Sequence, residues 1–326
     1  MKKPSKSRPF ERTPSKGANQ RPVSSDQKRF GEAGVNRPTP GSRNRDNDKL
    51  ARSNGHTPVY DPAQIPRPKR VPEGVDRKDE IKACGINACK AIFDARPNDI
   101  VRFYVTEELV KEFGKLLKYC AQKKKTYHIV STADLAKISG SSHHEGVCMI
   151  AKARSGLSYP DILIELEATK SQKELVLILE NVENPHNVGA IIRSAAHFGV
   201  KAIFAPNVDF FKPSASLLRT AEGGGEIVPV IGAPSMENLT KDLRAKGFKI
   251  IAADGQAKKS HLFSSALLAQ RVAVIVGNEG KGLSPEARKL TDGVFAIPGT
   301  GRVESLNVST AVAVICAEFW RTQRIQ

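Results

Sequence analysis

From residue 174 onward, apolar runs of strand length alternate with segments of helical pattern, and this alternation restricts the fold more than any other feature. The apolar runs span residues 175–180, 201–205, 227–231, 248–253, 272–276 and 294–297. Helical patterns occupy residues 188–198, 213–221, 235–246, 285–291 and 308–321. Near-continuous apolar strands alternating with helices are typical of a parallel sheet covered on both faces. The sequence therefore predicts an α/β domain over residues 174–326, with ligands bound at the carboxyl ends of its strands.

A smaller α/β domain is predicted over residues 75–155. Apolar residues near helical spacing mark residues 81–93, and residues 107–124 have an amphipathic helical pattern. Strands are predicted at residues 100–106, 127–131 and 146–153, and a short helix at 132–139 with Thr132 as its N-cap. We interpret residues 156–173, which contain Gly156 and Pro160, as a linker.

The first 74 residues are predicted to be a disordered basic arm. Residues 1–72 contain 17 Lys and Arg, only 6 Asp and Glu, and 11 of the chain's 20 prolines. Such a segment buries too little apolar surface to offset the entropy lost on ordering. The arm either keeps the protein in solution or binds phosphates non-specifically, and its charge density favours binding.

The composition excludes several classes of protein. The net charge of +17 indicates a polyanionic partner, of which nucleic acid is the commonest. The five cysteines are scattered and form no CxxC pair, so we expect neither a disulfide framework nor a zinc ribbon, and no metal site. No apolar run approaches the length of a membrane span, and the first residues lack the apolar core of a signal peptide. We therefore expect a cytoplasmic protein.

Three polar loops follow apolar runs in the larger domain, and each carries more functional residue types than a connection needs. They are residues 180–199, residues 276–288, and the polar first part of residues 297–319, which contains Pro298, Gly299, Gly301, Ser305 and Asn307. Each has a structural alternative: Asn187 as an N-cap, Arg193 as a solvated helix residue, Ser284 as a cap before Pro285. Nucleotide fingerprints do not fit, because Lys281 is followed by Gly282 rather than Ser or Thr, and GxGxxG is absent from the first strand–helix turn.

The three loops together resemble a known family. The segments NPHNVGAIIRSA, VGNEGKGLS and IPGTGRVESLNVSTA are similar, in order and spacing, to the signature motifs of the SpoU, or TrmH-type, RNA ribose methyltransferases of the SPOUT superfamily. The resemblance covers residues 174–321. The smaller predicted domain, which ends in HHEGVCMIAKA, also resembles the family's small substrate-binding domain. That domain is similar to RNA-binding ribosomal proteins.

This resemblance implies a fold, a cofactor and partners. The end of the larger domain is expected to form a deep trefoil knot, a rare exception to unknotted topology. The knot loops would enclose S-adenosyl-L-methionine, and the protein would pair as a homodimer through the knot region. The helix at residues 308–321 offers Val312, Ile315, Phe319 and Trp320 as an apolar face for that pairing. Gly299 and Gly301 are expected to let one backbone segment pass another.

Individual residues carry roles by the same resemblance. The residues expected to bind the cofactor are Gly277, Asn278, Ile297, Pro298, Gly301, Leu306 and Asn307. The catalytic set is Arg193, supported by Asn187, Glu279, Ser305 and Asn307. Because a guanidinium stays protonated, Arg193 is better suited to clamp a phosphate and stabilise a 2′-oxyanion than to act as a base. The chain departs from the family pattern only at Asn184 and Gly299, which supply no chemistry.

The implied reaction transfers a methyl group from S-adenosylmethionine to a ribose 2′-hydroxyl of ribosomal or transfer RNA. We favour ribosomal RNA, because the small domain resembles that of the family's ribosomal enzymes. A non-catalytic RNA-binding or ribosome-assembly factor with the same fold is the main alternative, although it would predict eroded polar residues in the motifs. A methyltransferase for proteins or small molecules agrees poorly with the charge of +17.

Overall fold

The computed structural model describes residues 79–154, 157–206, 213–255, 263–278, 280 and 282–323. The predicted basic arm, residues 1–74, lies outside the described residues, and so does Glu279.

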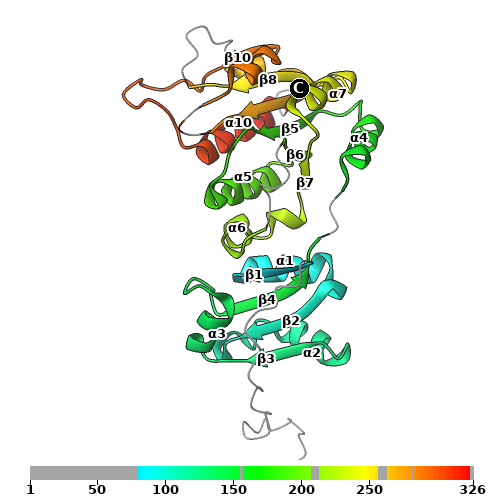
Figure 1. Cartoon of the computed structure of the whole chain (residues 1–326), viewed down its shortest axis with the longest axis vertical. Helices are drawn as coiled ribbons and strands as arrows, with labels where there is room; N and C mark the ends of the chain where they lie inside the picture. The colour runs from blue at the N-terminus through cyan, green and yellow to red at the C-terminus, as the bar shows by residue number, and fades with distance from the viewer. Residues whose placement is uncertain are drawn as a thin grey trace, which may run out of the picture. The chain divides into compact units, whose positions relative to one another are not determined.

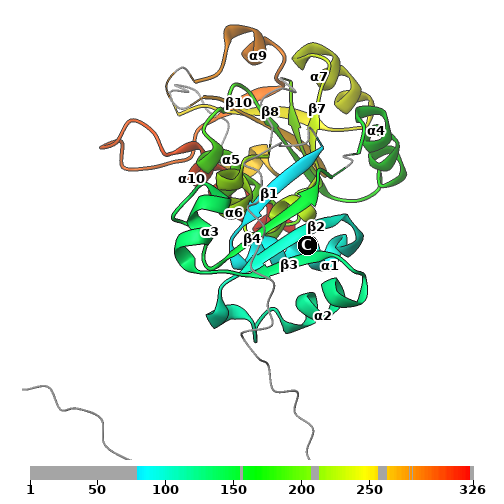
Figure 2. The same ribbon diagram turned by 60° about the horizontal axis from the view of Figure 1, so that its bottom comes forward.

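The smaller domain has a four-stranded mixed sheet (Figures 1 and 2). Its strands are ordered β1-β4-β2-β3, with β4 antiparallel to β1 and β2, and β3 parallel to β2. The strands are β1 (Glu80–Cys84), β2 (Ile100–Val105), β3 (Thr126–Ile129) and β4 (Val147–Lys152). The helices are α1 (Ile86–Ala95), α2 (Gly114–Gln122) and α3 (Thr132–Ser139), with short 3₁₀ turns η2 (Pro97–Asp99) and η3 (Glu107–Leu109).

Three predictions for this domain need correction. Residues 81–93 are not one helix, because β1 occupies the first part and Gly85, with φ of 101°, separates it from α1. The helix predicted at residues 107–124 is broken, since η3 precedes α2. The N-cap of α3 is Ser131 rather than Thr132, because the Ser131 side chain accepts a hydrogen bond from the Asp134 N–H.

A helix, α4 (Tyr159–Ala168), lies inside the segment that we interpreted as a linker, so that interpretation is wrong for these residues. Ser158 and Asp161 form a capping box at its start. Pro160 sits in the first turn, where a missing N–H costs nothing. The helix is held to the larger domain because Ile162 and Leu166 are fully buried in its core.

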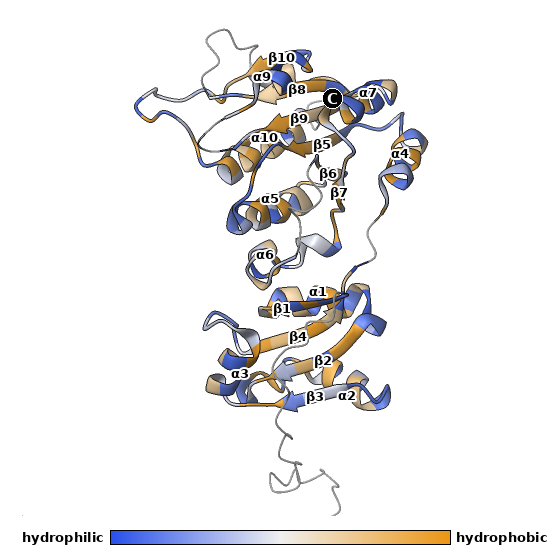
Figure 3. Cartoon of the chain, in the orientation of Figure 1, coloured by the Kyte–Doolittle hydropathy of each residue, from blue (hydrophilic) through white to orange (hydrophobic). Residues whose placement is uncertain are grey.

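The larger domain is built on a six-stranded sheet ordered β10-β8-β9-β5-β6-β7, in which every neighbouring pair is parallel. Its strands are β5 (Glu174–Leu179), β6 (Ala202–Ala205), β7 (Val230–Gly232), β8 (Lys249–Ala253), β9 (Arg271–Val276) and β10 (Gly293–Phe295). The predicted parallel α/β architecture is confirmed, and each apolar run overlaps one of these strands, although β7 shares only Val230 and Ile231 with the run at residues 227–231. Figure 3 shows the central strands β5, β8 and β9 as strongly hydrophobic.

Helices cover both faces of this sheet. They are α5 (Pro185–His197), α6 (Ala215–Ala221), α7 (Met236–Ala245), α8 (Phe263–Ala266), α9 (Pro285–Lys289) and α10 (Val308–Gln323), with the 3₁₀ turn η5 (Gly224–Glu226) after α6. Alternate residues of β5 enter the two cores: Leu175, Leu177 and Leu179 pack with α5, α6 and α10. Val176 and Ile178 pack with α4 and α7. This period of two is what a strand buried on both faces requires.

Helix α10 packs into the core of its own chain. Val312, Ile315 and Phe319 are buried there at 4% exposure or less, so they are not free to form a dimer face. The predicted face is wrong for these three residues, because they cover the sheet beside α5. Trp320 and Val314 remain partly exposed on the outer side of the helix.

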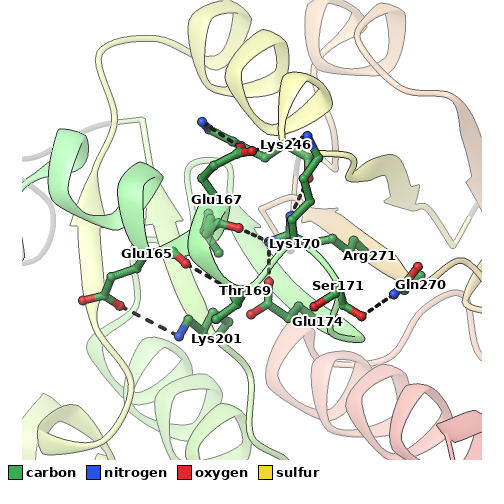
Figure 4. Close-up of polar contacts among 11 residues, drawn as sticks. Glu165, Glu167, Thr169, Lys170, Ser171, Glu174, Lys201, Lys246, Gln270 and Arg271 are labelled. Atoms are coloured by element: carbon green, nitrogen blue, oxygen red, sulfur yellow. Dashed lines mark hydrogen bonds and ion pairs between the residues drawn. The ribbon is translucent and has the colours of Figure 1, made fainter.

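The amino-terminal ends of β5 and β9 are joined by a buried ion pair between Glu174 and Arg271 (Figure 4). The Arg271 guanidinium also donates to the carbonyl oxygens of Leu166, at 2.7 Å, and Lys246, at 2.5 Å. It stacks on the Phe248 ring at 4.1 Å. These contacts fasten the ends of α4 and α7 to the sheet edge opposite the polar loops.

All five cysteines are buried and unpaired. Within the described part of the chain, no helix is long and apolar enough to cross a membrane.

Candidate functional site

The three polar loops meet at one edge of the larger sheet. They follow β5, β9 and β10, and parallel strands end at the same edge. The third loop, residues 296–307, extends away from the sheet in both ribbon views (Figures 1 and 2). The arrangement of the domain therefore brings together segments that are more than 100 residues apart in sequence.

The first loop leads into α5. Asn184 is the N-cap, because its side chain accepts a hydrogen bond from the His186 N–H at 2.9 Å, and Pro185 follows it. Asn187 is therefore not the N-cap, which corrects the structural alternative for that residue. It lies in the first turn of α5, with 9% of its surface exposed.

Asn307 links the third loop to the first. Its Nδ2 donates to Oδ1 of Asn187 at 3.1 Å. Its own Oδ1 accepts from the N–H of Ser309 at 2.8 Å and of Thr310 at 3.4 Å, so Asn307 caps α10. One side chain thus fixes the start of α10 and connects the first and third motifs.

Arg193 lies in α5, six residues after Asn187. Its side chain is 62% exposed, and Nη1 lies 3.5 Å from Oε1 of Glu222, which follows α6. Arg193 therefore presents its guanidinium at the surface, next to a carboxylate that the sequence reasoning had not identified.

The second loop folds back on itself after β9. The Gly282 N–H donates to the Asn278 carbonyl at 2.8 Å, and the Gly280 N–H donates to Asn278 Oδ1 at 2.8 Å. Asn278 Nδ2 donates to the Asn181 carbonyl at 2.9 Å, which joins this loop to the first one. A Cβ on Gly277 would lie 2.5 Å from the Gly282 carbonyl oxygen, so only glycine fits this turn.

Glu180, at the end of β5, also connects these two loops. Its carboxylate accepts from the Ser284 N–H at 3.0 Å and from the Ser284 hydroxyl at 2.5 Å. Ser284 is the N-cap of α9 and Pro285 its first residue, as the sequence suggested.

A cavity of about 780 Å³ opens between the second and third loops. The predicted cofactor residues that line it are Gly277, Asn278, Ile297, Pro298, Gly301 and Leu306, together with Ser305 from the catalytic set. Asn187, Arg193 and Asn307 are not among the described residues that line it. Its volume lies in the range of about 300–1,000 Å³ that is usual for small-molecule sites.

The expected role of two glycines is not borne out. A Cβ on Gly299 or Gly301 would meet no heavy atom within 4 Å, so these positions do not need glycine for a close backbone crossing. Gly301 instead has φ of 72°, which favours glycine for conformational reasons.

The cavity also contains an ion pair that the sequence reasoning missed. Asp254 follows β8, is 8% exposed, and pairs with Arg288 of α9; both residues line the cavity. The sequence signal for this pair is a single acidic residue directly after the apolar run at residues 248–253. It was missed because none of the three motif loops follows that run. Among the described residues, no group of three or more His, Cys, Asp or Glu side chains is placed to hold a metal ion.

Comparison with known protein families gives two matches. Residues 174–317 match the model of the SpoU rRNA Methylase family. Residues 82–156 match a model described as RNA 2′-O ribose methyltransferase substrate binding.

Two relatives illustrate the similarity of sequence. The uncharacterized tRNA/rRNA methyltransferase YfiF of Escherichia coli O157:H7 is 38% identical over 248 residues, or 76% of this chain and 70% of that protein. The 23S rRNA (guanosine-2′-O-)-methyltransferase RlmB of Xanthomonas campestris pv. campestris is 33% identical over 192 residues, or 59% of this chain and 76% of that protein.

Solved structures share the fold. The crystal structure of an RNA 2′-O ribose methyltransferase covers 76% of this chain and 90% of its own, with a TM-score of 0.61 at 23% identity. The SpoU methyltransferase AviRb from Streptomyces viridochromogenes, in complex with AdoMet, covers 76% of this chain and 91% of its own, with a TM-score of 0.60 at 21% identity.

Proposed function

The chain belongs to the SpoU rRNA Methylase family, and on that premise we propose that it is an S-adenosylmethionine-dependent enzyme that methylates a ribose 2′-hydroxyl of RNA. The observation that carries this proposal is the meeting of all three motif loops at one end of the sheet, where the second and third loops line a cavity and Asn307 of the third is bonded to Asn187 of the first. The substrate class that we favour is ribosomal RNA. The non-catalytic alternative is not favoured, because the relatives are named methyltransferases.

The residues of the cavity suit S-adenosylmethionine. Val276, Leu283, Ile297 and Leu306 provide apolar walls for an adenine ring, and the glycine-rich loops expose backbone groups for its polar edge. The Asp254 carboxylate lies in the cavity wall and is paired with Arg288. A positively charged ligand would compete with Arg288 for this carboxylate. When bound, this cofactor would supply an electrophilic methyl group on a sulfonium.

In this proposal Arg193 acts on the RNA. Its exposed guanidinium binds the phosphate next to the reacting ribose and stabilises the 2′-oxygen as it loses its proton. Asn187 and Asn307 hold the first loop against the third, and Ser305 and Glu279 orient the ribose and the cofactor loops. Gly277, Asn278, Ile297, Pro298, Gly301 and Leu306 hold the cofactor.

We also propose that two copies of the chain pair through this region, which includes the trefoil knot of the family. Arg193 does not line the cavity of its own chain. The Arg193 guanidinium and the bound cofactor must therefore be brought together by the RNA or by a second copy of the chain. The outer residues Trp320 and Val314 of α10 are partly exposed and suit such a contact. Light scattering at tens of micromolar should give twice the mass of the chain, and a monomeric mass would refute pairing.

The remaining parts are assigned to RNA binding in the cytoplasm. Residues 75–155 form the ribosomal-protein-like substrate-binding domain, and the basic arm, residues 1–74, adds non-specific affinity for phosphates. Deletion of residues 1–72 should weaken RNA binding and flatten its salt dependence, because fewer counterions are released. Binding of S-adenosylmethionine should be unchanged. Equal salt slopes for the two proteins would show that the arm only keeps the protein in solution.

The proposed role of Arg193 is tested by methyl transfer to total RNA from a strain that lacks the gene. Arg193→Ala should lower turnover by about 100-fold or more, while the affinity for S-adenosylmethionine is retained. Arg193→Lys should restore little, because an ammonium lacks the planar fork of the guanidinium. Near-normal turnover by Arg193→Ala would refute this role.

A further inference from the structure

We propose that Glu222 is a positioning residue that holds the Arg193 guanidinium in its working orientation. This inference rests on the proposed function, since it assigns a role through Arg193. Glu222 lies outside the three motif loops, in the turn between α6 and η5.

The Glu222 carboxylate contacts two side chains. Oε1 lies 3.5 Å from Nη1 of Arg193. Oε2 accepts a hydrogen bond from Nδ2 of Asn87, in helix α1. Asn87 belongs to the region that matches the substrate-binding model. Glu222 is therefore fixed from one side while it holds Arg193 from the other.

The backbone of this turn brings Glu222 to Arg193. A Cβ on Gly224 would lie 3.0 Å from the Ile192 carbonyl oxygen and 3.3 Å from the Arg193 Cα, so glycine allows the turn to approach α5 closely. Residues 223–225 are all glycine. The residue before them is glutamate, although its φ of 51° and ψ of 39° are left-handed and would suit a fourth glycine.

The ion pair with Arg193 does not explain this choice of residue through folding stability. A left-handed backbone is unfavourable for any residue with a Cβ. An ion pair as exposed as this one, with 62% of the arginine side chain and 27% of the glutamate accessible, contributes little to folding and less than the strained backbone costs. Strained residues of this kind cluster at active sites and switch regions. The function that the geometry offers is control of Arg193.

Glu222 has two effects on Arg193. It restricts the rotamers of a long exposed side chain, which reduces the entropy lost when the guanidinium engages the reacting group. It also competes with RNA phosphates for the same guanidinium, which disfavours unproductive binding. Loss of its charge should therefore lower kcat while the KM for RNA stays constant or falls.

Methyl transfer with the full-length protein tests whether kcat falls while the KM for RNA does not rise. Glu222→Gln keeps the shape and an acceptor for Asn87 but removes the charge. It should lower kcat about 10- to 100-fold without raising the KM for RNA, and the affinity for S-adenosylmethionine should not change. The charge-matched control is Glu237→Gln, an exposed position in the first turn of α7, and it should leave kcat unchanged. Unchanged kcat in Glu222→Gln would overturn the inference.

Glu222→Gly separates positioning from a structural role. Glycine relieves the left-handed backbone but also removes the bond to Asn87, so the melting temperature should stay within about 2 °C of the wild type while kcat falls at least as far as in Glu222→Gln. A residue with a merely structural role would instead give a clearly lower melting temperature, with activity lost in proportion to folded protein. That result would overturn the inference.

A binding measurement tests the coupling without catalysis. With a fluorescein-labelled polyuridine oligonucleotide, Glu222→Gln should tighten binding about three- to tenfold when Arg193 is present, and clearly less in Arg193→Ala protein. Equal changes in the two backgrounds would overturn the inference. Failure of the proposed function is distinguishable, because wild-type protein would then transfer no methyl to RNA whatever the binding cycle showed.

Discussion

The Gly277→Ala substitution should disable the cofactor cavity through one added methyl group. Gly277 does not have a positive φ, so the effect of alanine is steric rather than conformational. The added Cβ would lie 2.5 Å from the Gly282 carbonyl oxygen, 2.6 Å from its carbon and 2.9 Å from the Leu283 nitrogen. All three atoms belong to backbone, so no side chain can rotate away to relieve the contact.

The magnitude follows from that overlap. The second loop must move by several tenths of an ångström, and overpacking of this kind costs about 1–3 kcal/mol. Binding of S-adenosylmethionine requires the loop in its present conformation, so the free energy needed to restore that conformation in the variant is lost from binding. The affinity for S-adenosylmethionine therefore falls about 5- to 150-fold. The clash lies within the protein itself, so it acts whether or not the methyl group also enters the space of the cofactor.

Isothermal titration calorimetry with S-adenosylmethionine measures this change. Gly114→Ala is the matched control, because a Cβ there meets nothing within 4 Å and Gly114 begins α2, away from the cavity lining. That variant should bind the cofactor like the wild type. Wild-type affinity in Gly277→Ala protein would show that the loop tolerates the methyl group and would refute the steric argument.

Three further predictions concern stability and pH. Arg271→Met leaves the Glu174 carboxylate buried without its partner and should lower the free energy of unfolding, measured in urea, by about 3–5 kcal/mol. The control is Lys170→Met, which removes an exposed ion pair in the same region (Figure 4) and should change this free energy by about 0.5 kcal/mol or less. Burial and the nearby Arg102 lower the pKa of His128 below its ordinary value of 6.5. As the pH falls, His128 is therefore protonated in the unfolded chain before it is protonated in the folded one. The free energy of unfolding should fall as the pH drops below 6.5, and it should fall by less in His128→Phe protein. Asn307→Ala removes the cap of α10 and the bond to Asn187, and calorimetry should show a loss of about 1–2 kcal/mol of stability together with weaker cofactor binding.

The larger domain was predictable because its strands are buried on both faces. A run such as residues 272–276 is apolar without interruption, and glycines at 199 and 247, with φ of 69° and 85°, follow the ends of the helices α5 and α7. The smaller domain was harder to predict. Ile81 and Cys84 are three residues apart, a spacing that agrees with a helix, yet they lie in a strand that Gly85 terminates.

The site was predictable only where motif residues are local in sequence. The three loops were identified, but the cap role of Asn307 and its bond to Asn187 depend on residues 120 positions apart. The Glu222–Arg193 pair and the Asp254–Arg288 pair were missed for the same reason, since no spacing rule relates their members. Helix α4 was missed because Gly156 and Pro160 are typical of a loop, whereas Pro160 is also favourable in a first helical turn.

The chemical position of the transferred methyl group distinguishes ribose methylation from methylation of a base. Tritium-labelled S-adenosylmethionine and wild-type protein are incubated with total RNA from a strain that lacks the gene, and the RNA is then hydrolysed in alkali. Alkaline cleavage uses the 2′-hydroxyl as its nucleophile, so a 2′-O-methyl group protects the adjoining phosphodiester. We predict label in alkali-resistant dinucleotides. Label in mononucleotides, which indicates methylation of a base, or no label in RNA at all, would contradict it.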